Sequence, residues 1–183
     1  MFRTIVIFIL LNFFNPLMAS TKEDIISKMR ITNNLSFDFI QTIDEKSENG
    51  KCIIEYPKKI WCKYNNSNMK VIVSNGKSLV IKTANKGSYY RYPLHKTPLE
   101  FLLDKKYLIL KMTILEPREI NNKYLNFKFY ENDNEINIFF DKKSLNLIGW
   151  QTKDIYQNLV VTFISSVKIN QKINNKIFIL PKK

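Results

Sequence analysis

The chain has 183 residues, a formal net charge of +13, and a composition that is 45% hydrophobic and 13% aromatic. A single histidine nearly excludes His-dependent catalytic triads and multi-histidine metal sites, and four glycines leave no Gly-rich phosphate-binding loop. The charge either favours anionic partners such as membrane headgroups or reflects lysines scattered over a solvated surface. Nucleic acid is not an expected partner, because the lysines do not cluster on one helix.

Residues 1–19 are predicted to form a secretory signal peptide. Arg3 supplies the positive charge, the apolar run 5–14 follows, and Ala19 is the small residue at the cleavage point. An N-terminal membrane anchor is the alternative, although the run is short for a span of roughly 20 apolar residues. No cysteine lies near position 20, so lipidation there is not expected. Residues 20–183 should then form a single exported, soluble domain, expected to be a monomer.

The first predicted elements after the signal peptide are a short helix and a strand. The helix begins at Thr21 and ends near Asn33, and its apolar face carries three closely spaced side chains. These are Ile25, Ile26 and Met29. Apolar side chains at positions 35, 37 and 39 then have the two-residue period of a strand.

Two cysteines flank a predicted hairpin of residues 52–56 and 60–64. If its turn centres on Pro57, Cys52 and Cys62 lie directly opposite each other, and a disulfide can form in an oxidising compartment. If the register is shifted by two residues, they are diagonal and such a bond is strained. A metal site made from these cysteines and His95 is poorly supported, because zinc usually takes four ligands, or three and water.

A second hairpin is predicted to turn at Asn75-Gly76, since both residues tolerate the positive φ of a tight turn. It joins strands near residues 70–73 and 79–83, and the aromatic strand 89–92 follows. Thr97-Pro98-Leu99-Glu100 then has the pattern of a capping box with proline at the first helical position. It predicts a short apolar helix over residues 98–104.

The rest of the chain continues as a meander. Residues 107–115 are ambiguous between helix and strand, and strands are predicted near residues 125–129, 136–140, 145–151, 159–163 and 177–179. A single sheet of about ten short strands tends to curl. The predicted class is therefore mainly β (α+β): an incomplete antiparallel β-barrel, or strongly curved sheet, closed by short helices as a lid.

The scarcity of catalytic groups argues for binding and against an enzyme, with no cofactor expected. Alternation along the strands predicts an apolar cavity that would hold acyl chains, although each side chain could equally be ordinary core. Its expected lining is Phe37, Phe39, Ile54, Tyr56, Ile60 and Tyr64. The expected lid residues are Ile25, Ile26, Met29, Leu99, Leu102 and Leu103.

The order of these features resembles the periplasmic outer-membrane lipoprotein carrier family (LolA-type). Five stretches carry the resemblance over nearly the whole exported chain. They are Phe39-Ile40-Gln41, the cysteine hairpin 50–64, the segment 71–79 (VIVSNGKSL), the segment 92–99 (YPLHKTPL), and a closing region with 147–150 (LIGW), Asp154, 170–178 and Pro181.

The resemblance implies a half-barrel lidded by helices that carries acylated lipoproteins through the periplasm. The implied partners are acylated lipoproteins, an inner-membrane lipoprotein-releasing ABC transporter and an outer-membrane receptor. A lipid-binding sensor or regulatory protein on the same fold is the alternative. The chain departs from the family at Tyr56, where the best-known members have an arginine that holds the lid closed, and at Gln157, where they have glycine. Its cysteines replace large apolar residues of the cavity.

Overall fold

The structure is a computed structural model that describes residues 21–183 except 67, 85–86, 133 and 155. The predicted signal peptide, residues 1–19, lies outside the described residues. The helices are α1 (Thr21–Ile31), η1 (Leu94–Lys96), α2 (Leu99–Leu103), α3 (Lys105–Ile114) and η2 (Asn175–Phe178), of which η1 and η2 are 3-10 helices. The strands are β1 (Asn34–Ile43), β2 (Lys46–Glu55), β3 (Lys59–Tyr64), β4 (Val71–Asn75), β5 (Ser78–Lys82), β6 (Tyr89–Pro93), β7 (Arg118–Ile120), β8 (Tyr124–Glu131), β9 (Asn134–Asp141), β10 (Leu147–Lys153) and β11 (Leu159–Ile169).

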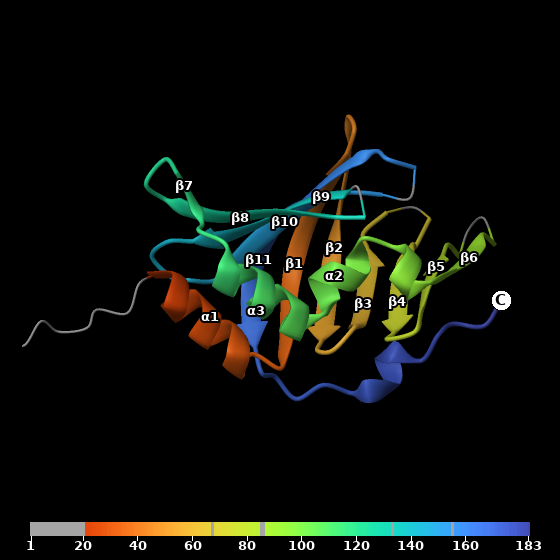
Figure 1. Cartoon of the computed structure of the whole chain (residues 1–183). Coiled ribbons are helices and arrows are strands. Elements are labelled where there is room, and N and C mark those ends of the chain that lie inside the picture. Colours follow the sequence, from red (N-terminus) through yellow and green to blue (C-terminus); the bar gives the residue numbers. More distant parts are fainter. Residues whose placement is uncertain (1–20, 67, 85–86, 133, 155) are drawn as a thin grey trace, which may run out of the picture.

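The eleven described strands form one antiparallel sheet in the order β6-β5-β4-β3-β2-β1-β11-β10-β9-β8-β7. Two meanders, β1–β6 and β7–β11, join where β1 pairs with β11 (Figure 1). Helices α1, α2 and α3 cover one face of the sheet, which we call the inner face (Figure 1). The predicted mainly-β class is confirmed, as an open curved sheet with short helices and not as a closed barrel. Among the described helices, none combines the length and apolarity that a membrane span requires.

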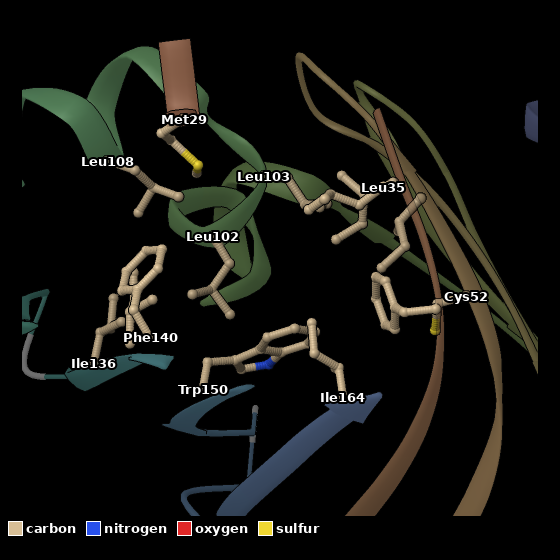
Figure 2. Close-up of a cluster of buried hydrophobic side chains, with 14 of the residues drawn as sticks. Met29, Leu35, Cys52, Leu102, Leu103, Leu108, Ile136, Phe140, Trp150 and Ile164 are labelled. Carbon is tan, nitrogen blue, oxygen red and sulfur yellow. The ribbon is translucent and has the colours of Figure 1, made fainter. Parts of the chain in front are cut away.

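The core lies between the inner face and the helices. Along β1, alternate side chains point inward, and Leu35, Phe37 and Phe39 are all buried. Figure 2 shows the core between the two layers, with Met29 and Leu108 on the helical side and Trp150 on the sheet. The two-residue period of the strands therefore places one apolar face against the helices.

The cysteine hairpin takes the register that centres on Pro57. Cys52 pairs directly with Cys62 across β2 and β3, their Cα atoms are 4.1 Å apart, and they form a disulfide. The Asn75-Gly76 turn also forms as predicted. It joins β4 to β5, and the Asn75 side chain accepts hydrogen bonds from the backbone N–H groups of Lys77 and Ser78 at 3.0 Å.

Two local expectations require correction. Residues 177–179 are not a strand: η2 covers residues 175–178, and Phe178 is buried near β3 and β4. The capping box also does not form, because the Thr97 hydroxyl donates to the Leu94 carbonyl at 2.8 Å, and the Glu100 side chain pairs with Lys58. The helix α2 nevertheless begins at Leu99, directly after Pro98.

The candidate functional site, a closed apolar cavity

A small apolar cavity lies between the helices and the inner face. Its volume is about 20 Å³, which is room for about one water molecule. The helices contribute Met29, Leu99, Leu102, Leu103, Leu108 and Met112 to its lining, and the sheet contributes Ile54, Tyr56, Ile60, Ile138, Phe140, Leu147 and Trp150. Figure 2 shows Leu102 pointing from α2 toward Trp150. The helices thus fill the space above the sheet with their own side chains.

Three of the six side chains expected to line a cavity from the sheet do line this one. These are Ile54, Tyr56 and Ile60. The other three lie in the core beside it. Phe37 packs edge-on against Trp150 with ring centroids 6.0 Å apart, and Phe39 packs against Tyr64 at 4.8 Å.

Four of the six predicted lid residues also line the cavity. They are Met29 on α1 and Leu99, Leu102 and Leu103 on α2. Ile25 and Ile26 are buried on α1, where Ile25 lines a second small void together with Leu35. The whole predicted lid therefore packs against the core, but only its α2 part and Met29 reach the cavity.

Side chains of α3 and of β9–β10 line the cavity as well, although the sequence did not predict them there. Leu108 and Met112 lie four residues apart on α3, the spacing that places two side chains on one helical face. That spacing is the signal that could have found them, had residues 107–115 been recognised as a helix. Ile138, Phe140 and Trp150 come from predicted strands whose inward side chains were not assigned to the cavity.

Lys58 connects α2 to the β2–β3 turn, and we call its contacts the Lys58 latch. The Lys58 ammonium lies 2.8 Å from Glu100 Oε1 and 3.3 Å from Asp104 Oδ2, and its backbone N–H donates to the Leu103 carbonyl at 2.9 Å. The hydrogen bond to Glu100 is the main cause that raises the pKa of Lys58. The Lys58 side chain remains 31% exposed. The latch is therefore polar and partly hydrated, and its contacts extend along α2 from Glu100 to Asp104, the residue directly after the helix.

Tyr56, at the family's arginine position, lines the cavity, and among the described residues no side-chain hydrogen bond joins it to α2. Burial raises the pKa of its phenol, and its backbone N–H donates to the Asn33 carbonyl at 3.0 Å. The contact that joins the hairpin to α2 thus comes from Lys58, two residues after the arginine position. Gln157 stands at the other position where the chain departs from the family. Its φ is +69°, a backbone conformation that favours glycine.

A partly buried chain of polar side chains lies on the inner face beside the Phe39–Tyr64 pair. The Tyr64 hydroxyl donates to Gln41 Oε1 at 2.9 Å, and Gln41 Nε2 donates to Thr162 Oγ1 at 3.1 Å. Gln41, on β1, thereby connects β3, which lies beyond β2, with β11, and this gives a physical reason for glutamine two residues after Phe39. Gly50 opposes Phe39, and a Cβ on it would lie 2.2 Å from the Lys63 carbonyl oxygen.

No metal-binding arrangement accompanies the cavity in the part of the chain that is described. Over residues 21–183, outside the five undescribed positions, no group of three or more His, Cys, Asp or Glu side chains could hold a metal ion. His95 is exposed in η1. The cavity offers burial of apolar surface, and the Lys58 latch adds a polar contact beside it.

Solved structures that are similar to this chain share little of its sequence. Among solved structures, the chain is similar to an uncharacterized conserved protein from Thermus thermophilus, with 6% identity, coverage of 88% of this chain and 93% of that chain, and a TM-score of 0.52. It is also similar to a LolA superfamily protein from Nitrosomonas europaea, with 10% identity, coverage of 87% and 98%, and a TM-score of 0.46. Similarity to the MucA/MucB complex of Pseudomonas aeruginosa has 8% identity and a TM-score of 0.47, and covers 89% of this chain but 62% of that chain.

No curated protein matches the chain. The family model described as outer membrane lipoprotein carrier protein LolA matches residues 30–180, which is well over half of the chain. That match includes the cysteine hairpin, α2, α3 and every strand from the hairpin onward. The chain therefore belongs to the LolA family.

Proposed function

We propose that this protein is a periplasmic carrier that shields the acyl chains of lipoproteins and moves them from the inner to the outer membrane. The observation that supports this most is the apolar cavity enclosed between the inner face and α2. The family fold supports a lipid- or lipoprotein-binding role. Members of this family are binding and carrier proteins, so no covalent step or cofactor is invoked.

Cargo would enter only after α2 moves. The closed cavity of about 20 Å³ has room for about one water molecule, far less than an acyl chain needs. Displacing α2 would withdraw Leu99, Leu102 and Leu103 together and leave Ile54, Ile60 and Trp150 to receive the chain. The lid side chains would thus occupy the cargo site in the empty protein and leave it in the loaded one.

This exchange would keep binding strong enough to shield cargo and weak enough to release it. Burial of each CH₂ group contributes about 0.8 kcal/mol, so roughly a dozen of them contribute about 10 kcal/mol before costs. Opening the lid separates apolar surfaces that are already buried and breaks the Lys58 latch, which offsets part of that gain. An inner-membrane ABC transporter would supply the cargo, and an outer-membrane receptor would accept it.

The test is release of a lipoprotein from spheroplasts. The purified exported chain is incubated with spheroplasts that make a triacylated outer-membrane lipoprotein, with a non-acylated version of the same protein as the control. We expect a water-soluble complex with the acylated protein alone. A folded chain that binds a hydrophobic dye but releases no lipoprotein would contradict the carrier and favour a lipid-binding sensor on the same fold.

A further inference from the structure

Lysines are aligned in a row across the outer face of the sheet, the face turned away from the helices. Lys51 on β2 and Lys63 on β3 lie directly opposite each other, and Lys63 also pairs with Val71, whose partner on β5 is Lys82. Lys51 and Lys63 are exposed, and the side chain of Lys51 is 75% exposed. Like charges directly opposite each other destabilise a sheet, so this row gains stability when an anion covers it.

Few acidic groups oppose this charge. Along β1–β6, every residue of which is described, two carboxylates point to the outer face: Asp38 lies 3.8 Å from Lys51, and Glu55 lies 2.9 Å from Lys59. The other cations of the same face are Lys63, Lys82 and Arg91, with Lys168 beside them on β11. The outer face of this half of the sheet is therefore strongly positive.

The segment after β11 adds further positive charge to this face. No acidic residue follows Asp154 in the sequence, whereas four lysines follow β11, at positions 172, 176, 182 and 183. The helix η2 packs near β3 and β4, where Phe178 is buried with Lys59 Nζ 5.6 Å from its ring centroid. Beyond it, the Lys182 carbonyl accepts a hydrogen bond from Lys82 at 2.8 Å. The segment thus returns to the end of the lysine row.

Exposed apolar side chains border the lysines. Ile40 on β1 and Phe163 on β11 pair directly, point to the outer face, and are 56% and 59% exposed. Phe163 also lines a hollow of about 730 Å³ that continues over Phe139 and Val161. A positive face with an apolar border matches an anionic bilayer, where headgroups meet the lysines and the outer acyl region meets the apolar side chains.

We propose that the outer face of the sheet, centred on Lys51, Lys63 and Lys168 and bordered by Ile40 and Phe163, docks the protein on bilayers rich in anionic phospholipid. This surface lies on the opposite face of the sheet from the cavity. Docking there leaves the helices and the Lys58 latch facing away from the membrane. The inference goes beyond the carrier function and does not depend on it, because it concerns vesicle binding by the empty protein.

The test is co-sedimentation with phosphatidylcholine vesicles that contain either no phosphatidylglycerol or about a third of it. We expect binding to the anionic vesicles that weakens with salt. The triple variant Lys51→Gln/Lys63→Gln/Lys168→Gln should bind about a hundredfold more weakly, at about fivefold for each lysine. The control Arg30→Gln/Lys96→Gln/Lys106→Gln removes the same charge from exposed positions on α1, η1 and α3, and should retain most of the binding.

A second measurement follows the apolar border and the orientation. Ile40→Ser/Phe163→Ser should weaken binding severalfold at low and high salt alike, because it removes no charge. In a Trp150→Phe background, the single remaining tryptophan is Trp61, on the outer face of β3. Brominated lipid in the vesicles should quench the fluorescence of Trp61. The proposal is overturned if the chain does not bind anionic vesicles at low salt, if the two triple variants lose binding equally, or if the fluorescence of Trp61 is not quenched. The first of these outcomes would assign the lysine row to an acidic protein partner.

Discussion

The two helices that follow η1, α2 and α3, cover the same cavity but are held in different ways. The ten-residue α3 begins with a side-chain cap, because Asp104 Oδ1 accepts a hydrogen bond from the Tyr107 N–H at 3.1 Å. Its first residue, Lys105, donates to the carbonyls of Arg30 and Thr32 at the end of α1, at 3.1 and 2.8 Å. Helix α3 is thus joined to α1 by contacts that satisfy helix-terminal carbonyls.

The same helix is also joined to the sheet. The Tyr107 hydroxyl donates to the Glu131 carboxylate on β8, and Lys111 pairs with Glu131 at 3.0 Å. Among the described residues, the polar connection between the five-residue α2 and the sheet is the Lys58 latch. This difference predicts that α3 is a fixed wall of the cavity and that α2 is the part that moves.

The largest effect is expected from a cavity in the fixed wall. Met112 on α3 is 1% exposed, so Met112→Ala should lower the free energy of unfolding by about 2–5 kcal/mol. The matched variant Leu99→Ala on α2 removes a side chain that is only partly buried, and should cost about 1 kcal/mol. Urea denaturation measures both. Equal losses would show that α2 is as fixed as α3.

The next effect concerns cargo, measured with a fluorescent fatty acid. Leu99→Asp should weaken binding about tenfold with a modest loss of stability, because a carboxylate at the mouth opposes burial of an acyl chain. Leu102→Asp is the more severe change, because Leu102 is 7% exposed in the closed protein and its replacement places a carboxylate among buried side chains. Unfolding of both variants would make α2 ordinary core and remove its role as a lid.

Short-range patterns in the sequence were sufficient where one local interaction decides the structure. The Asn75-Gly76 turn fixes the β4–β5 register, and alternation placed Cys52 opposite Cys62 once the turn centred on Pro57. Residues 107–115 were ambiguous because apolar and β-branched residues, such as Ile109 and Ile114, suit both helix and strand. The side-chain cap from Asp104 and the packing of the α3 side chains against the core stabilise the helical conformation.

Other features depend on contacts between distant segments. Ile177 and Ile179 alternate like a strand, but the chain meets the outer face there, and the buried side chain is that of Phe178. The Lys58 latch joins residues 42 positions apart, so it appears only when α2 lies over the β2–β3 turn. Thr97 and Glu100 match the sequence pattern of a capping box. The ion pair with Lys58, however, holds the Glu100 carboxylate away from the first turn of α2.

A smaller effect should follow removal of the latch. Lys58→Met deletes two partly exposed ion pairs but leaves the backbone hydrogen bond to Leu103, so the closed state should lose about 1 kcal/mol or less. If binding needs the open state, fatty-acid affinity should rise up to about fivefold. The control Lys59→Met breaks an ion pair with Glu55 on the outer face and should leave affinity unchanged. Equal affinities for both variants would place the closure elsewhere.

The smallest effect tests the fixed wall by pH. Tyr107 and then Lys111 lower the pKa of the Glu131 carboxyl, so its ionised form stabilises the folded state. That contribution is complete above the unfolded pKa near 4.5 and disappears as the pH falls through the lower folded value. The free energy of unfolding of the wild type should therefore exceed that of Glu131→Gln by up to about 1 kcal/mol at pH 7. This difference should disappear toward pH 3. Glu23→Gln, at an exposed site on α1, is the control. If the difference in free energy of unfolding stays constant with pH, neutral hydrogen bonds hold α3 to β8. Helices α2 and α3 would then differ only in the number of contacts that hold them.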